Sequence, residues 1–224
     1  MSTREQIIIA LHGAGMQASV WETLASTLPC RALSFPKPSL TSIEAMSAWV
    51  ETQIENHPPQ SVILMGHSMG ALVALEAAKH PAVAGLVLIG AAAQMPVHPD
   101  LLKQAIDAPE AAATLILKWG VSPAHPEAVE VLKKHMQPKS LANDLAACNA
   151  YQHGETAARA VRQPVLVLAG SDDKLTKPAA AKALADILTH VQFHLVSGSG
   201  HMLMVESPVE IAKEIRMFVT AIQG

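Results

Sequence analysis

The stretch Ile63-Leu64-Met65-Gly66-His67-Ser68-Met69-Gly70-Ala71-Leu72-Val73-Ala74 decides the fold of this chain. It predicts a short buried strand over residues 62–65, a tight turn, and a helix that begins near Met69. The turn has the pattern G-x-S-x-G, and side chains in place of its two glycines would strike the neighbouring strand and helix. Ser68 lies at the apex, and we interpret its exposed hydroxyl as a nucleophile. The pattern also arises by chance, so this interpretation depends on the groups that the rest of the chain supplies.

The composition indicates a single compact enzyme-sized unit. Of the 224 residues, 50% are hydrophobic and 16% are charged, which allows a large core. The net charge is −3 and no basic run exceeds Lys133-Lys134, so we expect no nucleic acid and no membrane partner. No apolar stretch reaches transmembrane length, and the run over residues 7–11 is too short for a signal-peptide core. Cys30 and Cys148 match no metal or redox spacing, and we expect free thiols in the cytoplasm.

Strands and helices alternate on both sides of the opening stretch. The first strand, Ile7-Ile8-Ile9-Ala10-Leu11, is continuously apolar, as in a parallel sheet covered on both faces. The remaining predicted elements are a helix over 19–28 with Ser19 as its N-cap, a weaker strand over 30–35, a helix over 43–56 capped by Thr41 or Ser42, a helix over 71–79, strands over 85–89, 164–169 and 191–196, and helices over 178–188 and 208–222. This alternation predicts a doubly wound α/β fold with a mostly parallel sheet of about six strands.

The alternation breaks between residues 91 and 163, where no convincing strand is found. Proline-punctuated helices are expected there, at roughly 98–106, 109–119, 126–136 and 140–151. We interpret residues 91–163 as a helical cap inserted before the last two strands, and residues 1–90 and 164–224 as the core; the cap is not an independent domain. Its carboxylates are interpreted as solvated helix faces: Asp100, Asp107, Glu110, Glu127 and Asp144.

Three loops at the carboxyl ends of predicted strands contain candidate catalytic residues. They hold Ser68, the pair Asp172-Asp173 and His201, and such strand ends meet at one edge of a parallel sheet. Serine needs a base to remove its proton, histidine serves as that base near neutral pH, and a carboxylate fixes the histidine tautomer. The tetrahedral oxyanion needs backbone N–H donors, which we assign to Met69 and Ala14. The order Ser, Asp, His is that of a hydrolase-fold catalytic triad.

Four motifs in this order resemble those of the α/β-hydrolase-fold serine hydrolases. They are His12-Gly13-Ala14-Gly15 (oxyanion loop), Gly66-His67-Ser68-Met69-Gly70 (nucleophile elbow), Gly170-Ser171-Asp172-Asp173 with Pro178 (acid loop), and Gly198-Ser199-Gly200-His201 followed by Glu206-Ser207-Pro208 (histidine loop). The resemblance covers residues 5–90 and 164–222 and implies that fold and that triad. In the family pattern the acid lies three residues after the glycine, which favours Asp173 over Asp172.

The chain departs from the family pattern at two places. Only six residues precede the first strand, so the family's initial antiparallel hairpin is expected to be absent. The second strand ends in Phe35-Pro36-Lys37-Pro38, where many relatives carry an Asp and a Gly-rich turn. This departure concerns the shape of that side of the pocket and leaves the triad unaffected.

Further residues are candidates for the pocket or for its support. The substrate-binding candidates are Trp21, Met95, Trp119 and Met202, and Leu115 and Met136 are weighed with them; for each, ordinary core packing is the alternative. We expect His12 to make a structural hydrogen bond in the oxyanion loop, and His67 to point away from the pocket and pin the elbow. The cap histidines His98, His135 and His153 are expected at the surface rather than in the pocket. No histidine pair has metal-ligand spacing, so no metal and no other cofactor is expected.

These observations predict a serine hydrolase that cleaves a small or medium, mostly apolar carboxylic ester through an acyl-enzyme intermediate. Ser68 attacks, His201 transfers the proton, Asp173 orients His201, and the partner is a small-molecule substrate. Within the family resemblance, a serine at the elbow argues against dehalogenases and epoxide hydrolases, which use a carboxylate there. A hydrolase of carbon–carbon bonds in diketones, a thioesterase, a peptidase and a non-catalytic ligand-binding protein remain alternatives. The sequence predicts no oligomeric state.

Overall fold

The computed structural model describes residues 6–36 and 40–223, which contain a six-stranded parallel sheet of order β2-β1-β3-β4-β5-β6. The strands are β1 (Ile7–Leu11), β2 (Arg31–Leu33), β3 (Val62–His67), β4 (Val83–Ile89), β5 (Val165–Gly170) and β6 (Val191–Val196). Every neighbouring pair is parallel, and β1 aligns Leu11 with Gly66 of β3. The predicted parallel sheet is confirmed. The predicted loop over residues 36–39 lies largely outside the described residues.

Burial along the strands explains why their sequences are apolar throughout. All residues of β3, β4 and β5 are buried, because helices cover both faces of the sheet there. The edge strand β6 contains partly buried, exposed and buried positions, and its sequence Val191-Gln192-Phe193-His194-Leu195-Val196 is accordingly mixed. Central strands therefore carry the continuous apolar runs by which the sheet could be predicted.

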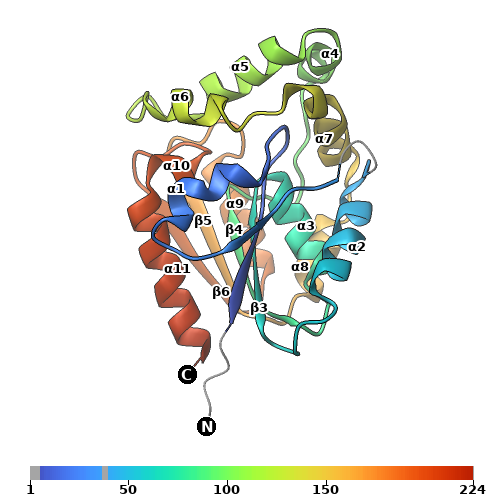
Figure 1. The fold of residues 1–224 in the computed structure, drawn as a ribbon, viewed down its shortest axis with the longest axis vertical. Coiled ribbons are helices and arrows are strands. Elements are labelled where there is room, and N and C mark those ends of the chain that lie inside the picture. The colour runs from blue at the N-terminus through green and yellow to red at the C-terminus, as the bar shows by residue number, and fades with distance from the viewer. Residues whose placement is uncertain (1–5, 37–39, 224) are drawn as a thin grey trace.

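Two helical layers enclose the sheet (Figure 1). One face packs against α2 (Ile43–Ile54), α3 (Met69–Ala77), α8 (Gly154–Ala160) and α9 (Pro178–Ile187). The other face packs against a 3₁₀ turn (Ala18–Trp21), α1 (Glu22–Ala25), α10 (Leu203–Glu206) and α11 (Pro208–Gln223). The two layers form two hydrophobic clusters, one on each side of the sheet.

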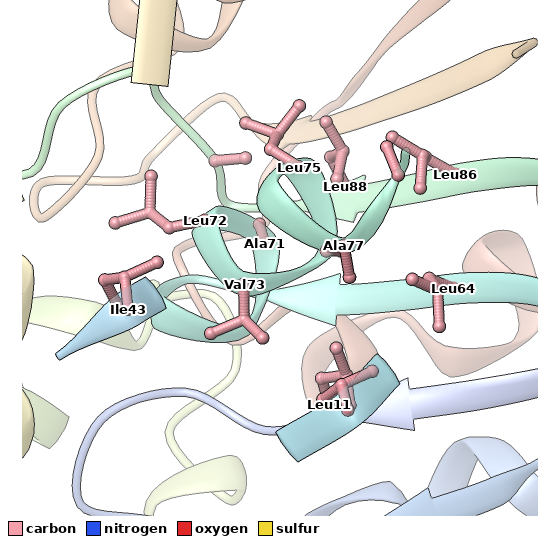
Figure 2. Close-up of a cluster of buried hydrophobic side chains, with 14 of the residues drawn as sticks. Leu11, Ile43, Leu64, Ala71, Leu72, Val73, Leu75, Ala77, Leu86 and Leu88 are labelled. Atoms are coloured by element: carbon pink, nitrogen blue, oxygen red, sulfur yellow. The ribbon is translucent and has the colours of Figure 1, made fainter. Parts of the chain in front are cut away.

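Helix α3, which starts at the elbow, lies in the middle of the first cluster (Figure 2). Its small residues Ala71 and Ala77 allow it to lie close to the sheet, where Leu64 of β3 and Leu86 of β4 are fully buried. Helix α2 packs against α3, and Ile43 at its start is also fully buried. This packing fixes the position of the α3 N-terminus, and with it the position of the elbow.

The segment between β4 and β5 is helical, and most of it lies across one end of the sheet, at the top of Figure 1. Its helices are α4 (Pro99–Asp107), α5 (Pro109–Gly120), α6 (Ala128–Lys133), α7 (Pro138–Ala150) and α8. Helices α4, α5 and α7 each begin with proline at the first position, which suits a residue without an N–H donor. Helix α8 was not predicted; it packs against α3 and α9 at the side of the sheet.

The N-cap expectations had different outcomes. The Ser42 hydroxyl accepts a hydrogen bond from the Ala45 N–H and caps α2, as expected. Ser19 caps no helix: the expected helix over 19–28 is a 3₁₀ turn followed by α1, with Gln17 as the first N-cap. The Ser19 hydroxyl instead hydrogen-bonds His135 Nδ1 at 2.8 Å, a tertiary contact that the local pattern does not show.

Within residues 6–36 and 40–223, none of the helices combines the length and the apolar composition needed to cross a lipid bilayer.

Candidate active site

Ser68 occupies a strained turn between β3 and α3. Its φ of 52° and ψ of −118° lie outside the regions that non-glycine residues normally adopt. A Cβ at Gly66 would lie 2.2 Å from the Gly70 carbonyl oxygen, and one at Gly70 would lie 2.4 Å from the Leu11 carbonyl oxygen. Only glycine therefore fits at either position. The partly buried Ser68 borders a cavity of about 410 Å³.

Asp173 and His201 are hydrogen-bonded at the same edge of the sheet. The His201 Nδ1–H donates to Asp173 Oδ2 at 2.7 Å, and both residues are 3% exposed. The other oxygen, Asp173 Oδ1, accepts the N–H groups of Leu175 and Thr176, each at 2.8 Å. Both carboxylate oxygens are thus held in place, and the tautomer leaves His201 Nε2 as the acceptor nitrogen. His201 borders the same cavity as Ser68.

Asp172 has a different set of partners. Its carboxylate accepts the hydroxyl protons of Ser122, at 2.7 Å, and Ser171, at 3.0 Å. The hydrogen bond from Ser122, followed by that from Ser171, holds the pKa of Asp172 below its usual value. Asp173, and not Asp172, contacts His201, which agrees with the choice made from the family pattern.

Glu206 supports the histidine loop, a role that the sequence reasoning missed. Glu206 is 6% exposed, and its carboxylate accepts three backbone N–H groups, from Ser122, Gly200 and Met202, each at 2.9 Å. Two of these donors flank His201 directly. The His201 N–H itself donates to the Gly120 carbonyl at 2.6 Å, so the end of α5 also anchors this loop. The only sequence signal for this role is an acid five residues after the histidine and two residues before Pro208.

His67 joins the elbow to the histidine loop. Its Nε2–H donates to the His201 carbonyl at 3.0 Å, and the two rings lie 4.8 Å apart. Burial, and secondarily the charge that His201 can carry, hold the pKa of His67 well below its usual value. His67 pins the elbow as expected. It is also among the residues that border the cavity.

The two proposed oxyanion donors lie at the same end of the sheet. Ala14 borders the cavity, and Met69 is the first residue of α3, so its N–H has no acceptor within that helix. His12 is fully buried; its Nδ1–H donates to the Gly13 carbonyl at 2.9 Å, and its Nε2 accepts the Phe35 N–H at 3.4 Å. His12 thus makes the structural hydrogen bonds expected of it.

Asp144 contradicts the expectation that it lies on a solvated helix face. It is 1% exposed on α7, and its Oδ2 accepts the Gly15 N–H at 2.9 Å. Local helix periodicity missed it because its partner lies 129 residues earlier in the chain. The other four acids in that expectation, Asp100, Asp107, Glu110 and Glu127, are exposed as expected.

The cavity is mainly apolar and is bordered by both the core and the inserted helices. Met95, Trp119 and Met202 border it, as expected for substrate-binding residues. Trp21 does not: it is fully buried in the second hydrophobic cluster, where core packing accounts for it. The residues that sequence reasoning missed here include Met16, Leu101, Ile116, Leu145, Cys148, Lys174 and Lys177.

Of the remaining candidates, Leu115 and Met136 do not border the cavity. His135 and His153 lie away from it as expected, whereas His98 is exposed and borders it. Across residues 6–36 and 40–223, no group of three or more His, Cys, Asp or Glu side chains is arranged to hold a metal ion.

Known proteins resemble this chain in sequence and in structure. The sequence model of the alpha/beta hydrolase family matches residues 8–214. The chain is 26% identical to the pimeloyl-[acyl-carrier protein] methyl ester esterase of Aromatoleum aromaticum, over 92% of this chain and 94% of that protein. It is 24% identical to the biotin biosynthesis bifunctional protein BioHC of Cellvibrio japonicus, over 95% of this chain but only 47% of that protein; the chain thus spans about half of that relative's length.

The solved structures support the fold. A thermophilic esterase superimposes with a TM-score of 0.87 at 22% identity, covering 98% of this chain and 91% of its own. The enol-lactonase of Burkholderia xenovorans LB400 superimposes with a TM-score of 0.84 at 20% identity, covering 96% and 92%. At these identities the likeness concerns the fold.

Proposed function

Because the chain belongs to the alpha/beta hydrolase family, we propose that it is a serine hydrolase that cleaves a small or medium, mostly apolar carboxylic ester. One observation carries the proposal: His201, hydrogen-bonded to the buried Asp173, borders the same cavity as Ser68, which stands in a strained elbow. A nucleophile, a base and an orienting carboxylate at one sheet edge are what acyl transfer requires.

In the proposed reaction, Ser68 Oγ attacks the ester carbonyl carbon while His201 Nε2 takes the hydroxyl proton. Asp173 keeps His201 in the required tautomer and stabilises its positive charge. The N–H groups of Ala14 and Met69 donate to the oxyanion of the tetrahedral intermediate. As this intermediate collapses, the alcohol leaves with the proton from His201. Water, deprotonated by His201, then attacks the acyl-enzyme, and the acid leaves as Ser68 regains its proton.

The environment of His201 suits this role. Burial keeps the pKa of the neighbouring His67 low, so His67 stays neutral near pH 7 and does not oppose the charge that develops on His201. Each proton transfer and each charge is handled by side chains and backbone of this chain, and we therefore propose no cofactor.

We propose that residues 91–163 act as a cap that selects the substrate. The cavity is bordered from this segment by Met95, Leu101, Ile116, Trp119 and Leu145, which present apolar surface. A volume of about 410 Å³ suits an acyl chain of small or medium length rather than a long lipid. The name of the Aromatoleum relative, a pimeloyl-[acyl-carrier protein] methyl ester esterase, is consistent with hydrolysis of an ester.

Turnover of p-nitrophenyl esters of increasing acyl length tests the proposal. Wild type should hydrolyse the short and medium esters, and Ser68→Ala should lower kcat by about 10³-fold or more. Parallel assays with a thioester, an amide and a diketone would identify a different bond if the esters are poor substrates. No turnover of any of them, or full activity in Ser68→Ala, would reject the proposal; binding without turnover would indicate a ligand-binding protein.

A further inference from the structure

Gly15 of the oxyanion loop is held by the inserted helices on both sides of its backbone. Its N–H donates to Asp144 Oδ2 at 2.9 Å, and its carbonyl accepts the Gln137 N–H at 2.6 Å. The next residue, Met16, forms an antiparallel β-bridge with Met136. The loop after β1 therefore lies against the start and the middle of α7, more than a hundred residues away in sequence.

The contact leaves little room for a side chain at position 15. Gly15 has a φ of +67°, which side chains disfavour, and a Cβ there would lie 2.6 Å from Leu141 Cδ1. The shape of the loop is thus complementary to the surface of α7. A change in the position of α7 would be transmitted directly to the backbone of Gly15.

Asp144 is an unexpected residue at such a contact. Asp144 is 1% exposed, and the loss of hydration by a buried carboxylate is costly unless hydrogen bonds replace the water. A neutral or apolar residue would serve packing alone at lower cost. The hydrogen bond to Gly15 is charge-assisted, and such bonds are shorter and stronger than bonds between neutral groups.

The position of this bond matters because Gly15 follows Ala14. Holding the Gly15 N–H fixes the plane of the Ala14–Gly15 peptide. The Ala14 N–H belongs to the preceding peptide plane, which joins this one at the Ala14 Cα, so fixing one plane limits the orientations open to the other. Preorganised donors of this kind supply much of the stabilisation of an oxyanion, and small displacements weaken them.

We infer that Asp144 is a positioning residue, which holds the oxyanion loop from α7 so that Ala14 can donate to the oxyanion. The inference rests on the proposed function, since it needs Ala14 as an oxyanion donor. It also gives the inserted segment a second role besides substrate selection: α7 completes the catalytic edge of the sheet.

The test compares Asp144→Ala, Asp144→Asn and the matched control Asn143→Ala. Asn143 is the neighbouring residue on α7, and its side chain donates to the Leu40 carbonyl at 2.9 Å instead of contacting the oxyanion loop. For Asp144→Ala we expect kcat to fall about 10- to 100-fold with KM within about twofold, because the loss concerns the transition state. Asp144→Asn keeps an oxygen acceptor and should restore most of kcat, and Asn143→Ala should keep it.

Inhibition by a trifluoromethyl ketone, whose adduct with Ser68 carries an oxyanion, gives a second readout. Its affinity should fall in Asp144→Ala by the same factor as kcat. Equal kcat and equal inhibition in Asp144→Ala and Asn143→Ala would overturn the inference, provided that hydrolysis still depends on Ser68. Loss of that dependence would instead overturn the proposed function. If Asp144→Ala does not fold, Asp144→Ser replaces it; failure of both to fold would reduce Asp144 to a structural residue and reject the inference.

Discussion

The imidazole of His67 donates a hydrogen bond from Nε2 to the carbonyl oxygen of His201, over 3.0 Å. This bond links the residue before the proposed nucleophile to the proposed base, although 134 positions separate them in sequence. The elbow and the histidine loop are thereby held as one unit. A cost accompanies this arrangement, because a fully buried imidazole resists protonation.

Replacing His67 should change how stability depends on pH. Because burial lowers the pKa of His67 in the folded chain, the unfolded chain binds more protons below pH 6.5 or so. The contribution of His67 is thus fully present above that pH and is lost as the pH falls, by up to about 1.4 kcal/mol per pH unit. His67→Gln, which cannot titrate, should show a flatter curve of unfolding free energy between pH 7 and pH 5, measured in urea.

His153 is exposed, so His153→Gln serves as the control for this measurement. It should keep the wild-type dependence of unfolding free energy on pH. If His67→Gln and wild type lost stability in parallel as the pH fell, His67 would not be the group that titrates.

The two aspartates of the acid loop should separate cleanly in kinetics. Asp173→Asn removes the acceptor that holds the His201 Nδ1–H, and an amide there favours the wrong tautomer, so kcat should fall about 10⁴-fold. Asp172→Asn should change kcat by no more than about threefold, because its amide oxygen can still accept from Ser122. Steady-state hydrolysis of one p-nitrophenyl ester measures both. A severe loss in Asp172→Asn alone would reverse the assignment of the acid.

Removal of the Glu206 carboxylate should affect both stability and catalysis. Glu206→Ala leaves the N–H groups of Ser122, Gly200 and Met202 buried without their acceptor, and we expect a loss of about 3 kcal/mol or more in unfolding free energy. Because two of these groups flank His201, kcat of the folded variant should fall as well. Urea unfolding and kcat below the unfolding temperature measure the two effects.

Glu210→Ala is the matched control for Glu206→Ala. Glu210 lies four residues later at the surface, where it pairs with His194, and exposed pairs contribute about 1 kcal/mol or less. Equal stability of the two variants would show that Glu206 does not hold the histidine loop.

The fold and the central residues of the site could be predicted because their signals are local. The apolar strand runs and the glycines around Ser68 can be read within a few consecutive residues, although distant parts of the chain contribute to the need for them. The order of four short motifs then identified the family, which the match over residues 8–214 confirms. Asp173 was also chosen by local spacing, from its distance to Gly170.

The supporting residues could not be predicted, because their partners are distant in sequence. Asp144 has the spacing of an ordinary polar helix position, and only the approach of Gly15 makes it a buried hydrogen-bond acceptor. The hydrogen bond between Ser19 and His135 likewise joins residues that are far apart in the sequence. Trp21 was weighed as a pocket residue, but the choice between pocket and core depends on which way the helix faces.

Two lysines should decide how well the cavity accepts an anionic substrate. Lys174 and Lys177 border it, whereas none of the described residues that line it is Asp or Glu. For an ester whose acyl chain ends in a carboxylate, Lys174→Ala with Lys177→Ala should raise KM about 3- to 10-fold, since each exposed pairing contributes up to about 1 kcal/mol. In this double variant, the uncharged ester of equal length should keep its wild-type KM. Lys182 pairs with Asp186 on α9 and does not border the cavity, so Lys182→Ala should leave the KM of the anionic ester unchanged. Added salt screens charges, so it should reduce the difference in KM between wild type and the double variant. An equal rise in KM for both esters would mean that the lysines shape the cavity without selecting charge.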